Sequence, residues 1–118
     1  MQAALSPNFL HVTGEQAKHI AYVIKSAKER GAQTVEPTPE AEQKWVDTIV
    51  NLSKLREAFL KECTPGYYNN EGLPADHRIA KSATYGAGSP AFFKLLSDWR
   101  AKGDLEGLDL GYAANDRV

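Results

Sequence analysis

Apolar residues recur at helical spacing in three segments of the chain. In residues 13–31 they form one apolar stripe at the spacing of a helix, which comprises Ala17, Ile20, Ala21, Ile24 and Ala27. Thr13 is the expected N-cap, with Gln16 completing a capping box, and Gly31 is expected to end the helix. Residues 1–12, which precede this pattern, are expected to form an extended loop or a short strand.

Two further helices are indicated by prolines that follow capping residues. Thr38 and Pro39 are expected to open the second helix, whose apolar stripe comprises Ala41, Trp45, Ile49, Leu52, Leu55 and Phe59. Ser89 and Pro90 repeat this start in the third helix, and Gly103 is expected to end it. Its apolar positions are Phe92, Phe93, Leu95, Leu96 and Trp99.

The remaining segments predict little sheet. Residues 33–36 are a candidate short strand, residues 67–88 form a long irregular stretch, and residues 104–110 are a short tail segment. A structureless loop of such length in a compact domain is often functional. The expected fold class is therefore mainly α (α+β with little sheet). We expect one domain, residues 1–118, with three helices joined by long irregular loops.

Composition narrows the possible partners. The chain has 118 residues and a net charge of -1, which gives no reason to expect a nucleic acid or an anionic membrane as partner. Cys63 is the single cysteine, and the three histidines lack metal-ligand spacing, so neither a disulfide framework nor a metal site is expected. Without an apolar run of about 18 residues or a signal peptide, a cytoplasmic protein is expected.

Three segments carry a resemblance to a known family. They are TVEPTPEAEQKW (34–45), CTPGYYNNEG (63–72) and YGAGSPAFFKLLSDWRAKGDLEGLDL (85–110). Together they resemble the C-terminal end of flavin-dependent Baeyer–Villiger monooxygenases, most closely the branch that acts on bulky ketones and steroids. The resemblance covers about residues 2–110 and implies that the chain corresponds to the tail of a much larger enzyme.

The family's cofactor-binding motifs do not occur in this sequence. Neither the FxGxxxHxxxWP fingerprint nor the two GxGxxG turns is present, and the family's active-site arginine lies upstream of this region. Gly86 and Gly88 are expected to form a tight turn, since no convincing strand precedes them. We therefore expect the chain alone to bind no FAD tightly, to oxidise no NADPH and to insert no oxygen.

The resemblance also marks candidate binding residues. QAALSPNF (2–9) resembles a segment that lies near flavin and substrate, which implies substrate contacts from Asn8 and Phe9. CTPGYYNNEG resembles a loop that approaches the nicotinamide cofactor and the substrate pocket, which implicates Tyr67, Tyr68 and Asn69. Many relatives have Trp-Tyr where this chain has its two tyrosines, so a cofactor hydrogen bond from that indole is not expected here.

Several ionisable side chains are candidates for acid/base catalysis. Asp76 and His77 are adjacent in the long loop, where a carboxylate can orient an imidazole, although sequence neighbours often point apart. His11 and Tyr68 are further catalytic candidates, and a structural role for His11 is the alternative. Tyr85 pairs apolar area with a hydroxyl and suits a substrate pocket as well as a small core.

His19 offers a second acid/base candidate on the first helix. Glu15 and Tyr22 fall one turn from it on either side, and histidine titrates near neutrality. At about 100° per residue, however, His19 lies opposite the stripe of Ala17, Ile20 and Ile24. A solvated helix face is therefore the favoured interpretation.

These sequence features lead to two candidate functions. The main prediction is a stand-alone, flavin-independent homodimer that binds a bulky apolar ketone-like secondary metabolite. It would isomerise, cyclise or dehydrate this small metabolite by acid/base chemistry. The alternative is a non-catalytic C-terminal piece or helper subunit that completes a flavoprotein partner, a flavin-dependent Baeyer–Villiger monooxygenase. The oligomeric state would discriminate between them, because a stand-alone domain would need to cover its apolar face.

Overall fold

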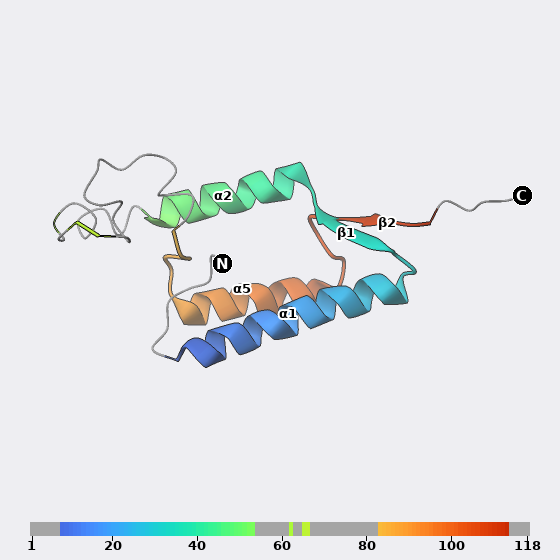
Figure 1. Ribbon diagram of the computed structural model, residues 1–118, viewed down its shortest axis with the longest axis horizontal. Helices are drawn as coiled ribbons and strands as arrows, with labels where there is room; N and C mark the ends of the chain where they lie inside the picture. Colours follow the sequence, from blue (N-terminus) through green and yellow to red (C-terminus); the bar gives the residue numbers. More distant parts are fainter. Residues whose placement is uncertain (1–7, 54–61, 63–64, 67–82, 114–118) are drawn as a thin grey trace, which may run out of the picture.

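Three helices and a two-stranded sheet make up the fold (Figure 1). The computed structural model describes residues 8–53, 62, 65–66 and 83–113. In chain order the elements are α1 (Phe9–Glu29), β1 (Thr34–Pro37), α2 (Pro39–Ser53), α5 (Ser89–Lys102) and β2 (Leu108–Gly111). The prediction of a mainly α fold with little sheet is confirmed for this part of the chain.

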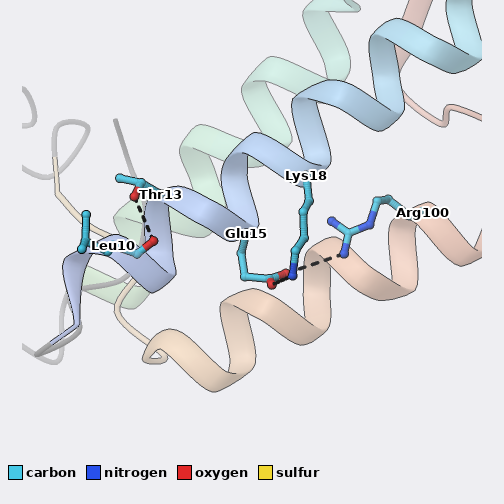
Figure 2. Close-up of polar contacts among 5 residues, drawn as sticks. All are labelled: Leu10, Thr13, Glu15, Lys18 and Arg100. Atoms are coloured by element: carbon cyan, nitrogen blue, oxygen red, sulfur yellow. Dashed lines mark hydrogen bonds and ion pairs between the residues drawn. The ribbon is translucent and has the colours of Figure 1, made fainter.

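Helix α1 begins one turn earlier than predicted. Asn8 is its N-cap, and the Asn8 Oδ1 atom accepts a hydrogen bond from the His11 backbone N–H at 3.2 Å. The Thr13 hydroxyl donates to the Leu10 carbonyl at 3.0 Å instead of capping the helix (Figure 2). The predicted loop or strand is therefore wrong for residues 9–12. The extra turn places Val12 in the core, where it is 2% exposed.

The C-terminal end of α1 is where the sequence predicts it. Gly31 has a φ of +74°, a conformation that favours glycine, and the Ala32 N–H donates to the Ala27 carbonyl at 3.0 Å. The guanidinium of Arg30 donates to the carbonyls of Gly103 and Asp104. These bonds tie the end of α1 to the end of α5, and the two helices lie side by side (Figure 1).

The start of α2 is confirmed, and the start of α5 is corrected. Thr38 caps α2, because its Oγ1 atom accepts from the Ala41 N–H at 3.1 Å. Helix α5 has Gly88 as its N-cap, with no side-chain capping bond, so Ser89 is the first helical residue and not the cap. Gly103 ends α5 in the left-handed conformation, as predicted.

The two strands form an antiparallel pair in which Thr34 lies opposite Gly111 and Pro37 opposite Leu108. The candidate strand at residues 33–36 is confirmed with a shift of one residue. Most of β2 lies within the tail segment at residues 104–110, where no strand was predicted. A strand needs a partner to satisfy its backbone groups, and this partner lies far away in sequence, where local patterning gives no signal.

A small hydrophobic core holds the helices together. Among the described residues, the buried hydrophobic side chains are Val12, Ala27, Ile49, Phe92 and Leu105. Val12 and Phe92 form its centre, and four partly buried side chains pack against them: Trp45, Tyr85, Phe93 and Leu96. The α2 stripe is confirmed as far as Leu52, whereas Leu55 and Phe59 lie outside the described residues. Leu95, one of the apolar positions of α5, is 40% exposed.

The apolar stripe predicted on α1 lies mostly on the outside of the described fold. Ala27 is buried, but Ile20 is 58% exposed and Ile24 is 55% exposed, and Ala17 and Ala21 are exposed as well. An amphipathic pattern shows that a helix has an apolar side, but it does not show which surface covers that side. In this structure α5 packs instead against the more polar side of α1.

Candidate functional site

Five rings from four segments form a continuous aromatic cluster near the start of α1 and α5. Trp45 stacks on Tyr85 with ring centroids 5.9 Å apart, and Tyr85 lies 5.6 Å from Phe92. Phe92 is 6.3 Å from Phe93, whose ring lies 4.6 Å from that of His11. The cluster therefore joins two predicted site residues, Tyr85 and His11, that are far apart in sequence.

A glycine turn positions Tyr85 within this cluster. Residues 86–87 form a turn immediately before α5, which agrees with the tight turn expected from Gly86 and Gly88. A Cβ atom on Gly86 would lie 2.6 Å from the Leu52 backbone oxygen. Gly86 therefore allows this segment to pass close to α2, which sets Tyr85 against Trp45.

The first turn of α1 carries the other predicted binding residues that the structure describes. Asn8 and His11 are exposed, and Phe9 is 66% exposed. The Asn8 side chain has a structural role as the N-cap. This turn lies next to the aromatic cluster, because the His11 ring contacts Phe93. Asn8, Phe9 and His11 are therefore accessible from outside the described fold.

The remaining predicted site residues lie outside the described residues. They are the catalytic candidates Asp76, His77 and Tyr68 and the binding candidates Tyr67 and Asn69. Their assignments stay predictions.

A group of polar residues, separate from the aromatic cluster, joins α1 to α5. Glu15 forms an ion pair with Lys18 on its own helix, and a Glu15 oxygen lies 3.9 Å from Nη2 of Arg100 (Figure 2). The His19 and Trp99 rings are 4.9 Å apart. The solvated position favoured for His19 is therefore wrong, because the ring is partly buried against α5. The sequence did show a tryptophan, Trp99, on the predicted third helix. It did not show that this helix packs against the helix that carries His19.

Two side chains at the contact between α1 and α5 have shifted pKa values. Burial lowers the pKa of His19, and the nearby Arg100 guanidinium lowers it further. The hydrogen bond from Lys18 lowers the pKa of Glu15, although burial opposes this shift. Within the described part of the chain, His19 Nδ1 and Arg100 Nη1 are buried without a hydrogen-bond partner. The geometry thus favours a neutral imidazole between the helices.

The lowered pKa of His19 predicts acid sensitivity. The unfolded chain takes up the proton first, near the ordinary value of 6.5, so protonation favours unfolding. The contribution of His19 to stability is complete above this value and is lost as the pH falls through it toward the folded pKa. Urea unfolding of wild type and His19→Gln at a series of pH values measures the effect. The wild type should lose more stability on acidification, and equal pH slopes would contradict the prediction.

The described residues do not provide a dinucleotide-binding fold. Such a fold needs parallel strands connected by a helix, with a glycine-rich turn at the helix start. Here the two strands are antiparallel, and Gly86 lies close against the α2 backbone. These residues also contain no group of three potential metal ligands. None of the described helices has the length and apolar character needed to cross a membrane.

The sequence and fold together match the C-terminal region of Baeyer–Villiger and FAD-binding monooxygenases. Pentalenolactone D synthase from Streptomyces exfoliatus is 43% identical over 110 residues, which cover 93% of this chain and 19% of that enzyme. The chain thus spans about a fifth of the length of this relative. No family model matches the chain.

Two solved structures share the fold. The polycyclic ketone monooxygenase from Thermothelomyces thermophila aligns with a TM-score of 0.68 and 35% identity, over 82% of this chain and 16% of that one. A steroid monooxygenase, whose structure is described as bound to NADP, also gives a TM-score of 0.68. Its identity is 19%, over 96% of this chain and 20% of that one, so it shows likeness of fold alone. The predicted resemblance to the family's C-terminal region is confirmed.

Proposed function

We propose that this chain acts as the C-terminal part of a flavin-dependent Baeyer–Villiger monooxygenase and forms one wall of its ketone site. The aromatic cluster carries this proposal, because its contacting rings connect the exposed residue His11 to the partly buried Tyr85. Aromatic side chains with a polar tip suit a bulky apolar ketone that has one oxygen to orient.

The redox chemistry then belongs to the rest of the enzyme. With FAD and NADPH bound there, NADPH would supply the reducing equivalents, FAD would relay them and molecular oxygen would be the oxidant, and the side chains of this segment cannot supply this chemistry. The aromatic cluster would hold the ketone and exclude water from it, and the accessible first turn of α1 would border the same site. Positioning of this kind contributes strongly to catalysis without direct participation in the chemistry.

Acid/base catalysis without flavin is the second candidate, and the exposed imidazole of His11 beside the aromatic cluster favours it. In that case a homodimer would convert a ketone-like metabolite by isomerisation, cyclisation or dehydration, with Asp76, His77 and Tyr68 assisting His11. We rank it second because the core is small and the apolar side chains of α1 face outward. Both features suit a segment that packs on a larger body.

A segment exchange tests the proposed function. In the chimera, this chain replaces the matching segment of the Thermothelomyces thermophila polycyclic ketone monooxygenase. The chimera is expected to oxygenate a polycyclic ketone at the expense of NADPH, because the host supplies the cofactor sites. The isolated 118-residue chain, assayed in parallel with added FAD, is expected to show no turnover.

A further inference from the structure

The Tyr85 ring contacts two aromatic rings that come from different helices. The Trp45 ring, on α2, is parallel to it, with an interplanar angle of 0° and ring centroids 5.9 Å apart. The Phe92 ring, on α5, is tilted by 49° and lies 5.6 Å away. Parallel rings at this separation are offset from each other, an arrangement that aromatic pairs favour. Both helices therefore restrict the direction of the Tyr85 ring.

Helix α2 fixes the backbone beside Tyr85 as well as the ring. Gly86 follows Tyr85, and a Cβ atom on it would lie 2.6 Å from the Leu52 backbone oxygen. Trp45 and Leu52 are about two helical turns apart, so they lie on the same side of α2. One side of one helix thus contacts both the Tyr85 ring and the residue that follows it.

Trp45 is itself held by the core. Its side chain is partly buried and packs against the core pair of Val12 and Phe92. A side chain that packing holds in place can in turn hold its neighbour. Tyr85 carries the only hydroxyl among the rings of the aromatic cluster. Because this hydroxyl is at the far end of the ring, the direction of the ring decides where the hydroxyl lies.

We propose, on the basis of the proposed function, that Trp45 is a positioning residue of the ketone site. It acts through Tyr85: the stacked indole holds the Tyr85 ring so that its hydroxyl donates a hydrogen bond to the carbonyl oxygen of a bulky ketone. Without the indole, the Tyr85 ring would have to be ordered each time the ketone binds, which weakens binding. A neutral hydrogen bond of this kind changes the affinity for the ketone by roughly two- to tenfold.

The test uses the chimera with the polycyclic ketone monooxygenase and a polycyclic ketone that this host oxygenates. Tyr85→Phe removes the hydroxyl and keeps the ring. Trp45→Met removes the flat ring but keeps a large, flexible apolar side chain, whereas Trp45→Phe keeps a flat ring. Ile49→Val is the matched control for lost packing, because Ile49 is fully buried on α2 but does not belong to the aromatic cluster.

Tyr85→Phe and Trp45→Met should each lower kcat/KM for the ketone by roughly two- to tenfold and leave KM for NADPH unchanged. The double variant should lose no more than the more strongly affected single variant, because both substitutions remove the same hydrogen bond. Trp45→Phe should retain most of the parent efficiency. Ile49→Val should lower the stability but leave kcat/KM for the ketone unchanged.

Effects that multiply in the double variant would overturn the positioning role, while the proposed function would stand. Unchanged kcat/KM in Tyr85→Phe would have the same consequence. If Trp45→Met does not load flavin, Gly86→Ala takes its place, because overpacking against Leu52 moves Tyr85 away from Trp45. Its combination with Tyr85→Phe is then judged in the same way. A parent chimera that forms no oxygenated product would contradict the proposed function and the positioning role together.

Discussion

Replacement of Phe92 by alanine is expected to lower the free energy of unfolding by about 3–5 kcal/mol. Phe92 is 4% exposed and lies at the centre of the core with Val12. Its ring also contacts the rings of Tyr85 and Phe93, so truncation removes apolar contacts and leaves a cavity. The loss is large relative to the roughly 5–15 kcal/mol by which a domain is stable. Urea unfolding followed by circular dichroism measures it.

Leu95→Ala on the same helix is the matched control. Leu95 is 40% exposed, so its truncation removes less buried surface and should cost much less than Phe92→Ala. Both variants keep a good helix former in α5. Similar unfolding midpoints for the two variants would show that Phe92 does not form the centre of the core.

Gly86→Ala is expected to destabilise the fold by about 1–3 kcal/mol through overpacking. The added Cβ would lie 2.6 Å from the Leu52 backbone oxygen, which cannot move as freely as the end of a flexible side chain. The turn before α5 would have to shift away from α2, and Tyr85 would shift with it. Thermal unfolding measures the cost, and near-ultraviolet circular dichroism reports the change around Tyr85 and Trp45.

The matched control is Gly14→Ala, the same substitution within α1. A Cβ atom at this position meets nothing within 4 Å, and alanine is the better helix former. The isolated chain should therefore gain about 0.5–1 kcal/mol of stability. Opposite signs for the two glycine variants are the expected result. Equal effects would mean that the contact between Gly86 and Leu52 does not limit the packing of the turn.

Helix ends were predictable where the signal is local. Thr38 caps α2, and Gly31 and Gly103 end α1 and α5, because a cap or a left-handed glycine acts on the turn beside it. The start of α1 was missed because Asn8 and Thr13 are both acceptable caps. The earlier start was favoured because it buries Val12.

Features that depend on distant partners were less predictable. The sequence showed that α1 has an apolar side, but Ile20 and Ile24 lie on the surface while His19 packs on Trp99. A periodic apolar pattern does not show whether the surface that packs on it belongs to the same domain or to another domain. The strand β2 was missed for a related reason, because its partner β1 lies far earlier in the sequence.

The candidate site was predictable in part. His11 and Tyr85 were selected for their chemistry, and one aromatic cluster joins them in the structure. The connection itself could not be read from the sequence, because it runs through Phe92 and Phe93 on a third segment. Asp76 and His77 lie outside the described residues, so the predicted acid/base dyad stays a prediction.

The most direct test of the central claim is the mass of the product formed from a polycyclic ketone. The chimera and the isolated chain are each incubated with the ketone, FAD, NADPH and oxygen. We predict a product heavier by one oxygen atom from the chimera alone, with NADPH consumed as it forms. Conversion of the ketone by the isolated chain without consumption of NADPH, to a product of equal mass or one lighter by water, would contradict the proposed function.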